Sequence, residues 1–169
     1  MTEPESRAWL AVIATTELLP VALDSQLRTD SGISHFEFLV LTVLKQEPEN
    51  RLRMTDLAIA TNATLPRLSK VVTRLARRGL VEKLHTDGRQ VDARLTAEGR
   101  RLLVHAIPGH LDLVRHLVLD GLSEQQLTTL ASALEPVVAR LDPHRRLGLG
   151  VRQPAADTEA PTAAPTADA

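Results

Sequence analysis

The stretch Thr64-Leu-Pro-Arg-Leu-Ser-Lys-Val-Val-Thr-Arg-Leu-Ala-Arg-Arg-Gly79 decides the fold of this chain. Thr64 suits an N-cap, Pro66 suits the first turn, and Gly79 suits the left-handed position after the last turn. The apolar residues recur at i, i+3, i+4 and i+7, which predicts an amphipathic helix over residues 65–78. This apolar stripe consists of Leu68, Val71, Val72 and Leu75.

The other side of the predicted helix is basic and polar. It carries Arg67, Ser69, Lys70, Thr73, Arg74 and Arg77. No acidic residue occurs between positions 64 and 79, whereas an ordinary surface helix mixes both signs of charge. This composition indicates a helix that approaches a polyanion.

Two neighbouring segments place this helix in a known supersecondary unit. Residues 55–61 predict a short helix with Thr55 as N-cap, and Asn62-Ala63 predicts a tight turn. A helix, a short turn and a second helix form the DNA-binding helix-turn-helix, whose second helix enters the major groove. Residues 80–84 and 91–95 then flank Asp87-Gly88, a dipeptide favoured in hairpin turns, so a β-hairpin wing is expected.

In the order of these pieces the sequence resembles the MarR (multiple-antibiotic-resistance regulator) family of bacterial transcription factors over roughly residues 9–141. The segments that carry the resemblance are Leu57-Ala58, Arg74-Leu75, Arg78-Gly-Leu-Val-Glu82, Asp87-Gly-Arg89 and Leu95-Thr-Ala-Glu-Gly99. The resemblance implies a mainly α winged helix-turn-helix fold with N- and C-terminal dimerisation helices. It also implies that Arg89 enters the minor groove while Asp87 orients a basic side chain. A plain hairpin turn is the alternative, and the wing here is shorter than is usual in the family.

Charge is distributed unevenly along the chain. The net charge is −1, yet residues 51–103 hold twelve basic and five acidic residues, a local net charge of +7. This asymmetry favours one phosphate-binding face over a uniformly solvated surface. The chain has no cysteine, which excludes thiol chemistry and agrees with a reducing compartment. The longest apolar run, near residues 38–44, is too short to span a bilayer, and no secretion signal is expected, so we expect a cytoplasmic protein.

Capping signals and apolar spacing predict the remaining helices. The first helix is expected over residues 5–28, where Pro20 kinks or splits it, followed by a loop at 28–32. Ser34 and Glu37 form a capping box for a second helix, which ends near residue 46. Thr96 is expected to cap a helix that Pro108 bends but does not end, and Ser123 begins the last helix.

These elements predict one domain over residues 5–143. Its DNA-binding lobe covers about 51–96, and its dimerisation helices cover about 5–28 and 97–142. Residues 144–169 are rich in Ala, Pro and Thr and are expected to form a disordered tail. Because one recognition helix contacts too few base pairs to specify an operator, we expect a homodimer on a pseudo-palindromic site, with recognition helices about 34 Å apart.

The predicted DNA contacts follow from the faces of the basic helix and from the wing. Arg67 is expected to face the floor of the groove and contact a guanine, whereas Arg74 and Arg77 are expected to contact phosphates. A solvated surface charge is the alternative for each arginine. The full set is Thr64, Arg67, Ser69, Lys70, Thr73, Arg74, Arg77, Asp87 and Arg89.

The resemblance further implies a small, often phenolic or lipophilic effector between the dimerisation helices and the DNA-binding lobe. Candidate contacts are Trp9, Ile13, His35 and Phe36, with residues near His105. For each of them a core or boundary position is favoured over a ligand contact. The histidines invite a metal site at His105, Asp112 and His116, which share a helix face that Pro108-Gly109 interrupts. Since no cysteine or paired carboxylate completes such a site, no metal and no cofactor are expected.

No nucleotide-binding, nucleophile-elbow or zinc-protease motif occurs, so the sequence does not predict an enzyme. The prediction is a sequence-specific DNA-binding transcriptional regulator, and the resemblance implies a dimeric repressor released by a small ligand. A winged-helix adaptor that binds another protein, or a metal-responsive regulator, is the alternative.

Overall fold

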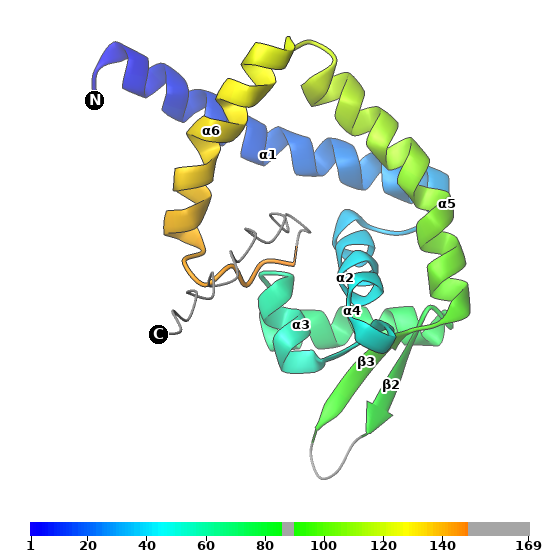
Figure 1. Ribbon diagram of the computed structural model, residues 1–169. Helices are drawn as coiled ribbons and strands as arrows, with labels where there is room; N and C mark the ends of the chain where they lie inside the picture. Colours follow the sequence, from blue (N-terminus) through cyan, green and yellow to red (C-terminus); the bar gives the residue numbers. More distant parts are fainter. Residues whose placement is uncertain (86–89, 149–169) are drawn as a thin grey trace, which may run out of the picture.

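The computed structural model describes residues 1–85 and 90–148 as a mainly helical chain with one small sheet (Figure 1). The helices are α1 (Glu3–Ser31), α2 (His35–Gln46), α3 (Met54–Ala60), α4 (Leu65–Arg77), α5 (Ala97–Val114) and α6 (Glu124–Leu141). The strands are β1 (Arg51–Arg53), β2 (Val81–His85) and β3 (Val91–Leu95). A 3₁₀ turn, η1 (Pro48–Asn50), precedes β1, and a π-helical turn, η2 (Arg115–Leu119), extends α5.

The chain builds one packed lobe and a set of long helices beside it. Helices α2, α3 and α4 lie below α1 in Figure 1, and the β2–β3 hairpin projects from their lower edge. Helix α5 runs from the hairpin back along the lobe and packs against α1 and α2. The largest fully buried side chains come from the end of α1, the connection between α1 and α2, and helices α2, α3, α4 and α5. They are Leu27, Ile33, Val40, Leu41, Val43, Leu44, Leu57, Leu68, Val72, Leu75 and Leu103.

Helix α1 differs from the sequence expectation at its C-terminal end. It is one continuous helix through Pro20, and it includes the predicted loop at 28–32 up to Ser31. Side chains four residues apart favour this extension, because Asp24 pairs with Arg28 and Gln26 donates to Asp30. The helix ends at Gly32, whose φ of 64° is left-handed.

The predicted helix starts are confirmed in α2, α5 and α6. Ser34 accepts from Glu37 N and the Glu37 side chain accepts from Ser34 N, which completes a capping box. Ser123 forms the same arrangement for α6, and the Thr96 side chain accepts from Gly99 N at the start of α5. Helix α5 continues through Pro108, as predicted from the apolar spacing that resumes in phase after Pro108-Gly109.

The sheet has the strand order β1-β3-β2 and is antiparallel throughout. The hairpin strands agree with the sequence prediction to within one residue at each end. Strand β1 was not predicted, and it pairs with β3 so that Leu52 lies opposite Ala93. The start of α3 was also predicted wrongly, since its N-cap is Arg53, and Thr55 lies inside the helix.

The long helices expose apolar surface that the single chain does not cover. Only Leu23 and Leu27 of α1 are buried, and α6 buries none of its residues within the described part of the chain. Contrary to the sequence expectation, α1 and the continuous helix α5–η2 are both long and apolar enough to cross a membrane by length and composition alone. Their exposed apolar residues therefore need another surface to cover them.

Candidate nucleic-acid interface

The turn between α3 and α4 fixes the angle of the helix-turn-helix. Asn62 adopts a left-handed φ of 48°, and the Ala63 N–H donates to the Ala58 carbonyl at 2.8 Å. The Thr61 hydroxyl donates to the Leu57 carbonyl at 2.7 Å and is buried. Since these bonds satisfy the end of α3 locally, α4 leaves the turn in one defined direction.

Helix α4 begins after Thr64, as predicted, with Pro66 in its first turn. Thr64 is the N-cap by position, but its hydroxyl makes no capping hydrogen bond. The predicted apolar stripe is confirmed, because Leu68, Val71, Val72 and Leu75 are buried. The face directly opposite this stripe is open to solvent.

The opposite face of α4 is defined by helical geometry. With 3.6 residues per turn, Lys70, Thr73 and Arg77 lie about 150–170° from the centre of the buried stripe. Lys70 and Arg77 are exposed, and Thr73 is half-buried. We call these three residues the outer face of α4. They are the predicted DNA contacts on α4 that lie farthest around the helix from the buried stripe.

The flank of α4 that faces the α1–α2 corner carries three arginines with partners inside the chain. The Cζ of Arg67 lies 4.2 Å from the ring centroid of Phe36. Arg74 Nε donates to Glu37 Oε1 at 2.8 Å. Arg78 Nη1 donates to the carbonyl of Gly32 at 3.0 Å. Arg67 is exposed on this flank, and its place on the groove floor stays a prediction.

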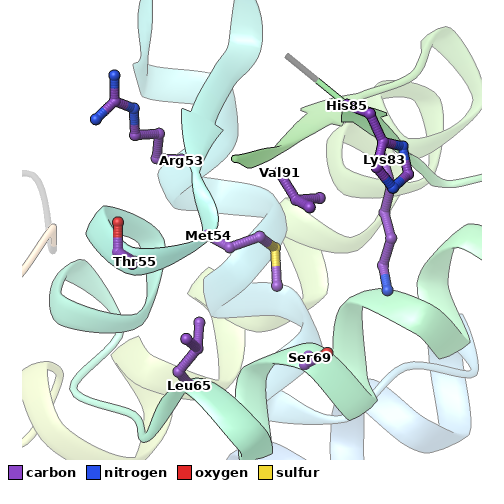
Figure 2. A pocket seen from close by; sticks show the side chains of 8 residues that line it. All are labelled: Arg53, Met54, Thr55, Leu65, Ser69, Lys83, His85 and Val91. Carbon is purple, nitrogen blue, oxygen red and sulfur yellow. The ribbon is translucent and has the colours of Figure 1, made fainter. Parts of the chain in front are cut away.

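The other flank of α4 faces the wing. Lys83 Nζ on β2 donates to Thr73 Oγ1 at 2.7 Å, and the Thr73 hydroxyl donates to the Ser69 carbonyl at 2.7 Å. Figure 2 shows Lys83 extending from its strand toward α4, beside a cleft of about 310 Å³ between the helix-turn-helix and the hairpin. Arg53, Met54, Thr55, Leu65, Ser69, Lys83, His85 and Val91 line this cleft. Of the two cations that line the cleft, Lys83 reaches α4, whereas the Arg53 side chain points away from α4 in Figure 2. The sequence predicts neither of them as a DNA contact.

The base of the wing contains an ion pair with a buried carboxylate. Asp92 on β3 is almost fully buried, and its Oδ2 accepts from Arg51 Nε at 2.7 Å. Arg94 on the same strand pairs with Glu82 on β2. The Arg51–Asp92 pair joins β1 to the hairpin, and the Arg94–Glu82 pair joins the two strands of the hairpin. Asp87 and Arg89, the predicted wing-tip contacts, lie outside the described residues.

The four predicted effector contacts do not gather in one place. His35 and Phe36 begin α2, where the His35 N–H donates to Asp24 Oδ1 at 2.8 Å. Trp9 lies fifteen residues before Asp24 on α1, which is about 22 Å along a helix, and Ile13 is one turn closer. Trp9 is 54% exposed and Ile13 is 37% exposed. A site built from all four residues needs Trp9 and Ile13 from a second chain.

The α1–α2–α5 junction instead holds a pair of histidines. The rings of His35 and His110 stack with centroids 6.0 Å apart, and Phe38 packs against His110 at 4.5 Å. Burial lowers the pKa of His35, which Asp24 partly opposes, and burial with the nearby His35 lowers the pKa of His110. Among the described residues, no group of three His, Asp or Glu side chains could hold a metal ion, and His105, Asp112 and His116 form no such group.

Sequence reasoning missed Glu37, Lys83 and Arg53 as parts of this interface. Glu37 was identified only as a capping residue, although it also pairs with Arg74. Lys83 lies two residues after the buried Val81 on β2, so the two side chains share one face of the sheet, the face toward α4. That alternation is the signal that could have identified Lys83.

A helix-turn-helix whose second helix has no acidic residue, followed by a β-hairpin, defines the winged helix-turn-helix class of DNA-binding proteins. The chain is similar to two solved Streptomyces coelicolor structures over 85% of its length. Sco3205, a MarR family transcriptional regulator solved in complex with DNA, is 37% identical, is covered over 91% of its own chain and has a TM-score of 0.79. AbsC, another MarR family transcriptional regulator, is 31% identical, is covered over 97% and has a TM-score of 0.78.

A third relative is a Bacillus subtilis protein, the HTH-type transcriptional repressor YetL. It is 30% identical over 112 residues, which span 65% of this chain and 66% of YetL. No family model matches the chain. The chain belongs to the MarR family of transcriptional regulators, because its similarity to Sco3205 and AbsC covers nearly all of both proteins.

Proposed function

We propose that this chain is a dimeric repressor that binds a pseudo-palindromic DNA operator through α4 of each protomer. The observation that carries the proposal is the outer face of α4, where Lys70 and Arg77 are exposed in a segment without acidic residues. The relative Sco3205 was solved in complex with DNA, and YetL is named as a repressor. These names support regulation of transcription over catalysis, and DNA as the partner implies the cytoplasm.

For DNA contacts we propose the outer face, Lys70, Thr73 and Arg77, together with Thr64 and Ser69 toward the N-terminal end of α4. Thr64 and Ser69 are neutral donors that suit phosphate or base-edge hydrogen bonds. Asp87 and Arg89 remain predictions for the wing tip. Lys83, which already donates to Thr73 Oγ1, adds a positive charge beside the same face.

For dimerisation we propose the apolar surfaces of α1, α5 and α6. Leu10 and Leu18 of α1 are 63% and 70% exposed, and Leu111 of α5 is 53% exposed. Contiguous exposed apolar surface of this kind marks an interaction site. We retain the proposed boundaries, a single domain over residues 5–143 and a tail over 144–169. In the described part of that tail, the Gly148 N–H donates to the Ala60 carbonyl at 2.8 Å.

Effector binding by Trp9, Ile13, His35 and Phe36 stays a prediction. We propose that an aromatic or lipophilic ligand bound there releases the protein from its operator. Titration of such ligands into the protein–operator complex measures that release.

The test of the proposed function is selection of bound duplexes from random DNA, followed by binding titrations on the selected site. We expect a near-palindromic motif with half-sites about 10 bp apart and an affinity that falls steeply with salt. Light scattering should find about twice the chain mass of 18.5 kDa. A protein that prefers no duplex over bulk genomic fragments refutes the proposal and leaves the adaptor alternative.

A further inference from the structure

Three arginines of α4 form a flank that faces the rest of the chain. Arg67, Arg74 and Arg78 recur at i, i+7 and i+11, so they share one side of the helix. That side lies about 90° from the buried stripe, between the core and the outer face. Each of the three contacts the corner where α1 ends and α2 begins.

Glu37 is the centre of these contacts. Its side chain is 4% exposed, and its two carboxylate oxygens are both used. Oε2 accepts from the Ser34 N–H at 2.8 Å, and Oε1 accepts from Arg74 Nε at 2.8 Å. Burial opposes ionisation, yet the hydrogen bonds with Ser34 and the ion pair with Arg74 hold the pKa of Glu37 below its ordinary value. A buried carboxylate in this position is stable only while the cation stays beside it.

Phe36 and Gly32 provide the other two contacts without any negative charge. The Phe36 ring supplies a π face to the Arg67 guanidinium, and the Gly32 carbonyl accepts from Arg78. The three contacts are spread over three turns of α4, from Arg67 near its start to Arg78 at its C-cap. Contacts so widely spaced restrain both the rotation and the tilt of the helix against α2.

We infer that Arg67, Arg74 and Arg78 are positioning residues, which hold α4 against Phe36, Glu37 and Gly32. The phosphate contacts are made by the outer face, through Lys70 and Arg77. This inference rests on the proposed DNA-binding function and changes which arginines perform it. Through its ion pair with Glu37, Arg74 fixes the orientation of α4, and therefore the orientation in which the outer face meets DNA.

Glu37→Gln distinguishes a positioning arginine from a phosphate-contacting arginine, because the two roles predict changes of opposite sign in operator affinity. The Gln side chain can still accept from Ser34 N, so the capping box is preserved, but Arg74 loses its anionic partner. If Arg74 is a positioning residue, operator affinity falls, roughly tenfold, while the slope of log K against log salt stays the same. If Arg74 contacts phosphate, the substitution frees the guanidinium, and affinity rises with a steeper slope.

Arg77→Ala is the matched control on the outer face. It removes one phosphate contact per protomer, so the slope for a dimer should become shallower by about 1.8. Phe36→Leu is the second variant, since it removes the platform for Arg67 and no charge. We expect Phe36→Leu to weaken operator binding with an unchanged slope, and circular dichroism with light scattering to find it folded and dimeric.

Tighter binding by Glu37→Gln, or wild-type affinity in both Glu37→Gln and Phe36→Leu, overturns the inference. Those results leave the proposed function intact, because the wild-type protein still selects its operator. A wild-type protein without any selected operator refutes the proposed function instead. The two failures are therefore distinct.

Discussion

Gly99, in the first turn of α5, lies close to the backbone of Leu80. A Cβ at this position would lie 2.7 Å from Leu95 Cδ1 and 3.0 Å from the carbonyl carbon of Leu80, and nearer still to the Leu80 oxygen. Real carbon atoms pack at about 3.5–4.0 Å. The Leu80 carbonyl also accepts from the Thr96 N–H at 3.1 Å, and the Thr96 hydroxyl donates to the Gly79 carbonyl at 2.7 Å. We predict that Gly99→Ala forces the end of α4 and the start of α5 apart.

The cost can be estimated from these contacts. Overpacking of a rigid site costs about 1–3 kcal/mol, and a weakened hydrogen bond between Thr96 and Leu80 adds about 0.5–1.5 kcal/mol. The sum, about 2–4 kcal/mol, corresponds to a melting temperature lower by roughly 5–15 °C for a chain of this size. The same displacement moves the C-terminal end of α4, so operator affinity should fall as well.

The measurement is thermal unfolding at matched protein concentration, because a dimer's melting temperature depends on concentration. Gly121→Ala is the control, since a Cβ at Gly121 meets no atom within 4 Å. We expect that control to stay within about 0.5 kcal/mol of the wild type. A Gly99→Ala protein with the same melting temperature as the Gly121→Ala control would refute the close approach of Gly99 to Leu80.

Two further predictions concern buried ionisable groups. Because the pKa values of His35 and His110 are lowered in the folded chain, the unfolded chain binds more protons below about pH 6.5, and stability should fall as pH decreases from 7 to 5. Urea unfolding measured between pH 7 and pH 5 tests this prediction. Replacing both histidines with Gln should make the free energy of unfolding depend less on pH. Asp92→Asn should lower the free energy of unfolding by about 1–3 kcal/mol, because the buried Asp92 then pairs less well with Arg51. Urea unfolding at pH 7 measures this loss, and an unchanged midpoint would contradict it.

The parts of the fold that the sequence predicted correctly are those with local signals. The stripe of α4, the capping box of Ser34 and the start of α5 at Thr96 each depend on residues within one or two turns. Strand β1 was missed because it has three residues and is held by β3, about forty positions later. The end of α1 was missed because paired side chains favour helix where the composition indicates a loop.

The candidate site was predicted less completely for the same reason. A sequence shows which residues of α4 lie away from the core stripe, but it does not show what lies beside them. The partners of Arg67 and Arg74 are on α2, more than thirty positions away, and the partner of Thr73 is on β2. Charge and position opposite the stripe therefore predicted DNA contacts at Arg67, Arg74 and Arg77 alike, whereas the packing distinguishes a flank with Arg67 and Arg74 from the outer face with Arg77.

Helix α6 should be ordered only while a partner covers it. It has 18 residues, none of them buried in the single chain, although Leu130, Leu134 and Val138 recur at helical spacing. An isolated helix of that length is marginal in water, so most of its stability must come from tertiary packing. Dilution that dissociates the dimer should therefore reduce the helical circular dichroism signal by about the share of α6. Leu134→Glu should give the reduced signal and a single-chain mass at every concentration. A monomeric Leu134→Glu protein with the full helical signal of the wild-type dimer would show that α6 folds without a partner.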